Sequence, residues 1–415
     1  MTVSARPDAP PGPLWRNRDF GLLWFGAAAS ILGVRVASIA WPLLVVFDGG
    51  SAEQAGLVGF AALLPQLVVQ LPAGVLVDRW DRRRVMLCAD LVGMLAIASV
   101  PAAMLLYRLT VPHLLAAAFL EGTAAICYQL AERAAVRSVV HPDHLPAALS
   151  QNEARSKGAG LVGQPLSTTL LSFASWMPFG VTVVGHAVSM VTLLAIRTPF
   201  QRPQRKPATL WKDLGEGLRW MREQKLLRSA LAVISVTNLV SQVLSLSMIL
   251  IVKESGGAVT TIGLIGLATG LGGLLGALCG SWFMKRLSLT TLFVGTLVLR
   301  VVLIPVIALT PEPWLLAGVF AAMSWAGGLM NVAGGVYQVR ITPEEMQGRA
   351  ASVGALVTSG ANSLGPLTGG LLLGAVGTTS TVVVAAGAMT VLALLAFTAV
   401  RRYGGTSNEK VWARP

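Results

Sequence analysis

Glu121 and Arg35 are ionisable residues that lie inside long apolar stretches of this 415-residue chain. A charge at the centre of a bilayer costs about 3 kcal/mol on insertion scales, so each is a candidate for function. A carboxylate can exchange a proton there, and a neighbouring arginine can tune its proton affinity. We hypothesise that Glu121 carries an exchangeable proton and that Arg35 modulates it. A permanent ion pair that fastens two helices, or a contact with a cationic ligand, are the alternatives.

A short turn at residues 74–84 places two carboxylates among four arginines. Charge-assisted hydrogen bonds in such a turn can form in one conformation and break in another. We expect a conformational-switch loop made of Gly74, Asp78, Arg79, Asp81, Arg82, Arg83 and, from the following apolar stretch, Asp90. A second charged cluster, at the ends of two later apolar stretches, is predicted to form a gate: Glu132, Arg133, Glu153 and Arg155.

Polar and aromatic residues in several apolar stretches could contact a ligand: Trp41, Tyr128, Gln129, Asn238, Gln242, Trp325, Asn331 and Gln338. With Met248 and Met330 they predict an adaptable, mostly apolar cavity, which suits a sizeable amphipathic molecule. Arg300 is expected to pack or to reach toward the membrane surface. His186 is expected to make a helix contact rather than to carry a proton.

The composition is that of a membrane protein. Hydrophobic residues make up 54% of the chain and charged residues only 12%, with a mean hydropathy of +0.68, whereas soluble domains carry roughly 25% charged residues. The net charge of +13 predicts contact with anionic lipid rather than nucleic acid, because the basic residues flank apolar stretches. The three cysteines lie within those stretches and predict neither a disulfide nor a metal site.

Twelve stretches are long enough, or nearly so, to cross a bilayer core that needs about 20 apolar residues in a helix. They are residues 20–47, 55–77, 85–107, 111–131, 158–175, 177–196, 229–252, 258–284, 287–309, 314–339, 350–376 and 380–400. The predicted fold class is therefore all-α integral membrane, with twelve transmembrane helices in two six-helix bundles. The first stretch is too long for a cleavable signal peptide.

Lysine and arginine are sorted to one side of these crossings. Of 32 such residues, 28 fall in the termini and in the gaps after even-numbered stretches, and only Arg108 and Lys253 fall in the other gaps. Because cytoplasmic loops are enriched in basic residues, both termini are predicted to be cytoplasmic. We expect a multi-pass protein of the cytoplasmic membrane, and a monomer.

The longest gap divides the chain into an N-terminal segment (1–19), a first bundle (20–196), a linker (197–228), a second bundle (229–400) and a tail (401–415). Within the linker, apolar residues from 210 to 221 recur at helical spacing, which fits a basic amphipathic helix on the membrane surface or a solvated connector. An offset of 201 residues aligns Pro165 with Pro366 and relates the two halves. Internal repeats of this kind are typical of secondary transporters.

The turn at residues 74–84 resembles the G-x-L-x-D-R-x-x-R-R signature of the major facilitator superfamily, and the resemblance covers the whole chain. Residues 14–20, 131–135 and 216–219 resemble its macrolide-efflux and siderophore-exporter-like branch. The resemblance implies that Asp78 helps to hold an outward-open state by docking near the cytoplasmic end of helix 11, with Arg79, Arg82 and Arg83 as partners.

The chain departs from the family pattern in three places. The second-half equivalent of the loop, residues 280–286, keeps the basic pair but has no aspartate. The antiporter-associated G-P-x-x-G-G element is intact at Gly365–Gly370 but reduced to Gly163-Gln164-Pro165 in the first half. Val34 stands where related exporters often carry an acidic residue.

Together these features predict a secondary active exporter of hydrophobic or amphipathic small molecules that works by alternating access in exchange for protons. The alternatives are a dedicated exporter of one endogenous metabolite or siderophore, an uptake transporter, and a non-transporting membrane protein. No phosphate loop and no catalytic motif is present in the sequence, so we expect neither an enzyme nor a cofactor.

Overall fold

The computed structural model describes residues 14–200 and 210–403, and all regular elements in these ranges are helices. Two are short 3-10 turns, Leu14–Arg16 and Pro142–His144. The α-helices are α1 (Arg18–Phe47), α2 (Ala52–Val68), α3 (Gln70–Arg79), α4 (Arg82–Leu105), α5 (Val111–Val139), α6 (Leu145–Phe173), α7 (Met177–Ala195), α8 (Leu210–Glu223), α9 (Lys225–Glu254), α10 (Val259–Met284), α11 (Leu289–Leu309), α12 (Pro313–Ile341) and α13 (Glu344–Tyr403).

Nine helices in the described ranges are long and apolar enough to cross a membrane. Helices α2 and α3, which meet at a bend of 51°, pass the same test of length and composition only as a pair, so the described ranges hold ten candidate spans when this pair counts as one. The 60 residues of α13 are two helices joined at Gly377, whose φ of 79° breaks the helical backbone. The all-α membrane fold is thus confirmed, while the count of twelve crossings stays a prediction.

Local sequence signals explain where several helices begin. The Asn17 side chain accepts a hydrogen bond from the Phe20 amide at the start of α1, and Ser51 forms a capping box with Gln54 at the start of α2. Asp81 likewise accepts from the Arg84 amide and starts α4. Side-chain oxygens at these positions satisfy amides that the first helical turn leaves free.

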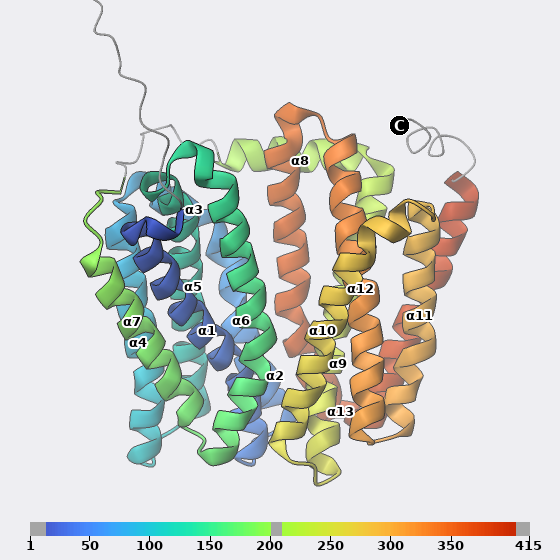
Figure 1. The fold of residues 1–415 in the computed structure, drawn as a ribbon. Coiled ribbons are helices and arrows are strands. Elements are labelled where there is room, and N and C mark those ends of the chain that lie inside the picture. The colour runs from blue at the N-terminus through green and yellow to red at the C-terminus, as the bar shows by residue number, and fades with distance from the viewer. Residues whose placement is uncertain (1–13, 201–209, 404–415) are drawn as a thin grey trace, which may run out of the picture.

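The helices form two groups (Figure 1). Helices α1–α7 lie on one side and α9–α13 on the other, with α8 running across the spanning helices. The start of α1, the end of α13 and α8 share one face, here called the terminal face. The turns after α1 and after α9 lie at the other, the opposite face.

The connecting helix α8 belongs to the second group. Met221 is buried with Leu227 and Val353, and Glu216 pairs with Arg349 at 2.8 Å. The sequence left open a membrane-surface helix or a solvated connector, and the structure shows a helix anchored at its C-terminal half to α9 and α13.

Close packing inside the second group depends on small residues. A Cβ atom at Gly276 would lie 2.0 Å from the Trp325 carbonyl oxygen, and a Cβ atom at Gly328 would lie 2.2 Å from the Gly273 carbonyl oxygen. Helices α10 and α12 therefore approach as near as their backbones allow, as small residues permit in membrane helices.

Candidate functional site

The two groups touch toward the opposite face, where α2 meets α13. A Cβ atom at Gly56 would lie 2.5 Å from the Pro366 carbonyl oxygen and 2.7 Å from the Gly370 Cα. Deeper along the same contact, Ser363 donates to the Leu63 carbonyl oxygen at 2.8 Å. The G-P-x-x-G-G element of the second half is therefore the surface that lets the two groups close.

A second contact, between α6 and α10, mirrors the first. The Gln164 amide donates to the Ile262 carbonyl oxygen at 3.3 Å, and a side chain at Gly263 would begin 3.1 Å from the Pro165 Cα. The two prolines related by the internal repeat thus lie at equivalent inter-bundle contacts. Lys253, one of the two basic residues in gaps that otherwise lack lysine and arginine, adds a hydrogen bond to the Val46 carbonyl oxygen at the end of α1.

The groups stand apart toward the terminal face. The switch-loop residues Asp78 and Arg79 are exposed, and Asp78 makes no ion pair with any described residue. Side chains built on Gly74 or Gly354 would meet nothing within 4 Å. The loop at the end of α3 is therefore disengaged from the second group.

The loop arginines bind carbonyl oxygens of their own group instead of Asp78. Arg82 donates to the Ala134 carbonyl oxygen at 3.1 Å, and Arg83 donates to that of Leu194 at 2.8 Å, near the end of α7. Cations at these positions offset the partial negative charge of helix C-termini. The predicted carboxylate–arginine network is absent among the described residues in this conformation.

A buried titratable cluster lies inside the first group. His186 Nδ1 on α7 is 2.8 Å from Asp90 Oδ1 on α4, and Ser30 on α1 donates to the same oxygen at 3.1 Å. Glu121 on α5 is 2% exposed, and its Oε1 has no partner among the described residues. His186 Nε2 is also buried without a partner among the described residues.

The structure corrects two sequence predictions about this cluster. Arg35 is exposed and forms no ion pair with Glu121, because it lies where α1 meets Gly163 of α6. Asp90 does not join the switch loop, because its side chain is fully buried against His186. The sequence analysis underrated His186. The available clue was a histidine, rare in a membrane helix, in the same half of the chain as the carboxylates Asp90 and Glu121 of other apolar stretches.

The predicted gate contains one buried ion pair. Arg155 on α6 and Glu132 on α5 are 3.1 Å apart with side chains only 4% and 3% exposed. Asn152 also donates to Glu132 at 3.0 Å, and Arg155 donates to the Trp24 carbonyl oxygen of α1 at 3.3 Å. The pair ties three helices of the first group together. Arg133 and Glu153 are exposed and lie outside it.

Replacing Glu132 with alanine should destabilise the protein by about 3–5 kcal/mol, because it leaves the Arg155 guanidinium buried without its counter-charge. Thermal unfolding of the detergent-solubilised protein measures the effect. Glu153→Ala is the matched control: Glu153 pairs with Lys157 at 3.4 Å on the surface, and exposed pairs contribute less than about 1 kcal/mol. Equal melting temperatures for the two variants would show that the buried Glu132–Arg155 pair does not stabilise the fold.

The predicted ligand-contacting residues divide into two sets. Trp41 is fully buried against Phe179 with ring centroids 4.9 Å apart, and the Tyr128 hydroxyl bonds that of Ser189 at 2.8 Å. Both therefore pack within the first group in this structure and do not line the pocket of the second group. Trp325 stacks edge-on against Phe283 at 5.4 Å. Gln129, Gln242 and Gln338 are half-buried, and Gln242 packs against Gly365.

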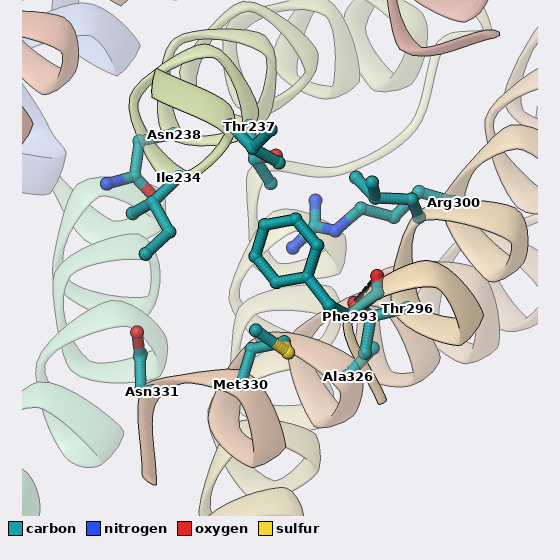
Figure 2. Close-up of a pocket in the computed structure, with 12 residues that line it drawn as sticks. Ile234, Thr237, Asn238, Phe293, Thr296, Arg300, Ala326, Met330 and Asn331 are labelled. Carbon is teal, nitrogen blue, oxygen red and sulfur yellow. Dashed lines mark hydrogen bonds between the residues drawn. The ribbon is translucent and has the colours of Figure 1, made fainter. Parts of the chain in front are cut away.

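Asn238 and Asn331 do line a pocket, inside the second group between α9, α11 and α12 (Figure 2). Arg300 lies at its inner end. The guanidinium is buried and bonds Ser241 and the Met323 carbonyl oxygen, so of the two arrangements expected for Arg300 the structure shows packing and not a side chain that reaches toward the membrane surface. The three free cysteines lie apart from this pocket, and the described residues contain no cluster that could hold a metal ion.

Two helical groups that close at one face, part at the other and enclose buried charges define a membrane transporter of the major facilitator superfamily. More narrowly, residues 9–411 match the family described as transmembrane secretion effector, and the chain belongs to that family.

Relatives in sequence are efflux proteins by name. The multidrug efflux pump Tap of Mycolicibacterium fortuitum is 27% identical over 371 residues, which covers 86% of this chain and 89% of the pump. The macrolide efflux protein A of Streptococcus pyogenes is 23% identical over 215 residues, 51% of this chain and 53% of that protein.

Solved structures share the fold at low identity. A bacterial homologue of the human lysosomal transporter Spinster superposes with a TM-score of 0.76 at 14% identity, covering 94% of this chain and 98% of that one. A bacterial homologue of the iron transporter ferroportin has a TM-score of 0.72 at 14% identity, covering 97% and 100%.

Proposed function

We propose that this protein exports hydrophobic or amphipathic small molecules from the cell by alternating access, in exchange for protons. The supporting observation is that the two groups meet along small residues toward the opposite face and part at the terminal face, where Asp78 is exposed. Such a pair of rigid bundles can rock around a central site. Efflux pumps among the relatives by name support the direction and the substrate class.

The terminal face is the cytoplasmic one in this proposal, since it carries nearly all lysine and arginine. The structure then corresponds to a state open to the cytoplasm, from which a substrate is loaded. The division into six and six helices, separated by residues 197–228, is part of the same proposal, as is a monomeric protein in the cytoplasmic membrane.

Proton coupling is assigned to Glu121 with His186 and Asp90. A carboxylate and an imidazole buried without full hydrogen bonding are costly when charged, so the cluster's protonation can depend on how α1, α4, α5 and α7 pack. The other buried charged groups of the first group, Glu132 on α5 and Arg155 on α6, pair with each other at 3.1 Å. Ser30 is the hydroxyl that bonds both Asp90 and, at 3.5 Å, His186.

Expression in a pump-deficient host tests the export function. Cells with the intact chain should grow at higher concentrations of several structurally unrelated amphipathic drugs than cells with an empty vector. Resistance to one compound alone would indicate a dedicated exporter, and increased sensitivity across the panel would indicate uptake. Unchanged growth on every compound, with the protein present in the membrane, would contradict the proposal.

A further inference from the structure

A pocket of about 80 Å³ lies inside the second group, between α9, α11 and α12. Figure 2 shows Arg300 at one end of it and Asn238 with Asn331 at the other, toward the pale green ribbon of the first group. Asn331 is exposed, whereas Arg300 is only 7% exposed. The pocket therefore leads from the space between the groups to a buried cation.

Arg300 forms no ion pair with any residue that the structure describes. Its Nη1 donates to the Ser241 hydroxyl at 3.0 Å and its Nη2 to the Met323 carbonyl oxygen at 3.2 Å, which occupies two of the five N–H donors of a guanidinium. The helices that line the pocket carry a single acidic residue, Glu254, at the far end of α9. Glu254 accepts from Thr378 there, so no carboxylate of these helices can neutralise Arg300.

The rest of the lining supplies further polar groups. Neither Asn238 nor Asn331 makes a side-chain hydrogen bond to any described residue, and Thr237 lies between Asn238 and the guanidinium. Phe293 and Met330 add apolar walls. A buried cation normally has an anionic partner, because the desolvation of an unpaired charge is expensive.

The size of the pocket limits what it can hold. A cavity volume of about 10–15 Å³ suffices for one water molecule. The pocket volume of about 80 Å³ therefore admits several waters or a small anionic group. Pockets that enclose drug-sized ligands measure about 300–1,000 Å³. Only one end of a larger molecule fits here, and its remaining part must lie between the two groups.

We propose that Arg300 binds the carboxylate, or an equivalent oxyanion, of an amphipathic substrate whose apolar body lies between the two groups. Arginine pairs with carboxylates through parallel N–H donors, which suits this role. This proposal rests on the export function proposed above and narrows it: the substrates include acidic amphiphiles. A free small anion could also neutralise Arg300, and the experiment below distinguishes it from the carboxylate of an amphipathic substrate.

Binding of 1-pyrenebutyrate and of its methyl ester to the detergent-purified full-length protein tests the assignment, with energy transfer from tryptophan to pyrene as the readout. The carboxylate should bind the unmodified protein at least about tenfold more tightly than the ester, since hydrogen bonds to charged groups are among the strong ones. In Arg300→Gln the carboxylate should bind as weakly as the ester, while the ester is unaffected. Arg300→Lys should retain part of the preference.

Arg286→Gln is the matched control, because it removes a charge from the same group where Arg286 stacks on Trp282 at 4.0 Å, away from the pocket. Acetate at equal concentration should not displace the probe, since it lacks the apolar body. Equal binding of acid and ester to the unmodified protein would overturn the proposal. Loss of both acid and ester binding in Arg300→Gln would also overturn it, because this result would indicate a structural role for Arg300. Acetate binding as tight as that of the probe would overturn it as well, because this result would indicate a site for a free anion. None of these outcomes depends on transport, so a failure of the export function is separately visible.

Discussion

In Glu121→Gln, efflux driven by a proton gradient should fall to the level of protein-free vesicles. Glutamine keeps the shape of the side chain but cannot release a proton, so exchange can no longer follow the pH difference. The site tolerates the change, because Glu121 Oε1 has no hydrogen-bond partner among the described residues and the replacement removes a buried ionisable group. Drug efflux from proteoliposomes, with and without an imposed pH gradient, is the measurement.

The matched control is Glu312→Gln, an exposed carboxylate at the start of α12, which should behave as the unmodified protein. The melting temperature of Glu121→Gln should equal or exceed that of the control, which separates coupling from folding. His186→Asn should also flatten the pH dependence, while Arg35→Gln should not, because Arg35 forms no pair with Glu121. Unaltered gradient-driven efflux in Glu121→Gln would end the proton assignment.

Valine at Gly370 should hold the transporter open toward the opposite face. A Cβ at this position would lie 2.8 Å from the Ala52 carbonyl oxygen and 2.9 Å from the Gly56 Cα, closer than packed atoms approach. Overpacking of this kind costs about 1–3 kcal/mol, and the cost arises only where α2 and α13 touch. The population of the conformation in which α2 and α13 touch should therefore fall roughly tenfold or more relative to the conformation in which they are apart. Efflux should slow as a result.

Labelling by a membrane-impermeant maleimide measures this shift. Ser363→Cys, introduced into a chain whose Cys88, Cys127 and Cys279 are replaced by serine, reports on the contact, because Ser363 bonds Leu63 across it. Labelling should be faster with Gly370→Val. Gly387→Val, in the second of the two helices that make up α13, where a Cβ meets nothing within 4 Å, should leave the rate unchanged. Equal rates for the two valine variants would refute the idea that this glycine controls closure.

The sequence alone determined the properties that depend on residue type along one helix. Hydropathy predicted the membrane-spanning helices, and the G-P-x-x-G-G element on α13 proved to be an inter-bundle contact because only small residues let backbones approach so closely. The single carboxylate of the fourth stretch, Glu121, was also recognisable, since a charge in an apolar helix is costly wherever the helix packs. The sequence also placed Glu132 and Arg155 in one charged cluster at the ends of two apolar stretches, but the structure decided which of its four members pair.

Only the tertiary structure decided which residues share a site. The rotation of each helix about its axis is set by packing against its neighbours, which is why Glu121 is buried and His186 meets Asp90, whereas Arg35 is exposed. The same rotation buries Trp41 and Tyr128 within the first group. It also turns Arg300 inward, toward a pocket lined by three helices that are separated in sequence. Spacing along one helix specifies a face, but the neighbour of that face depends on contacts between distant segments.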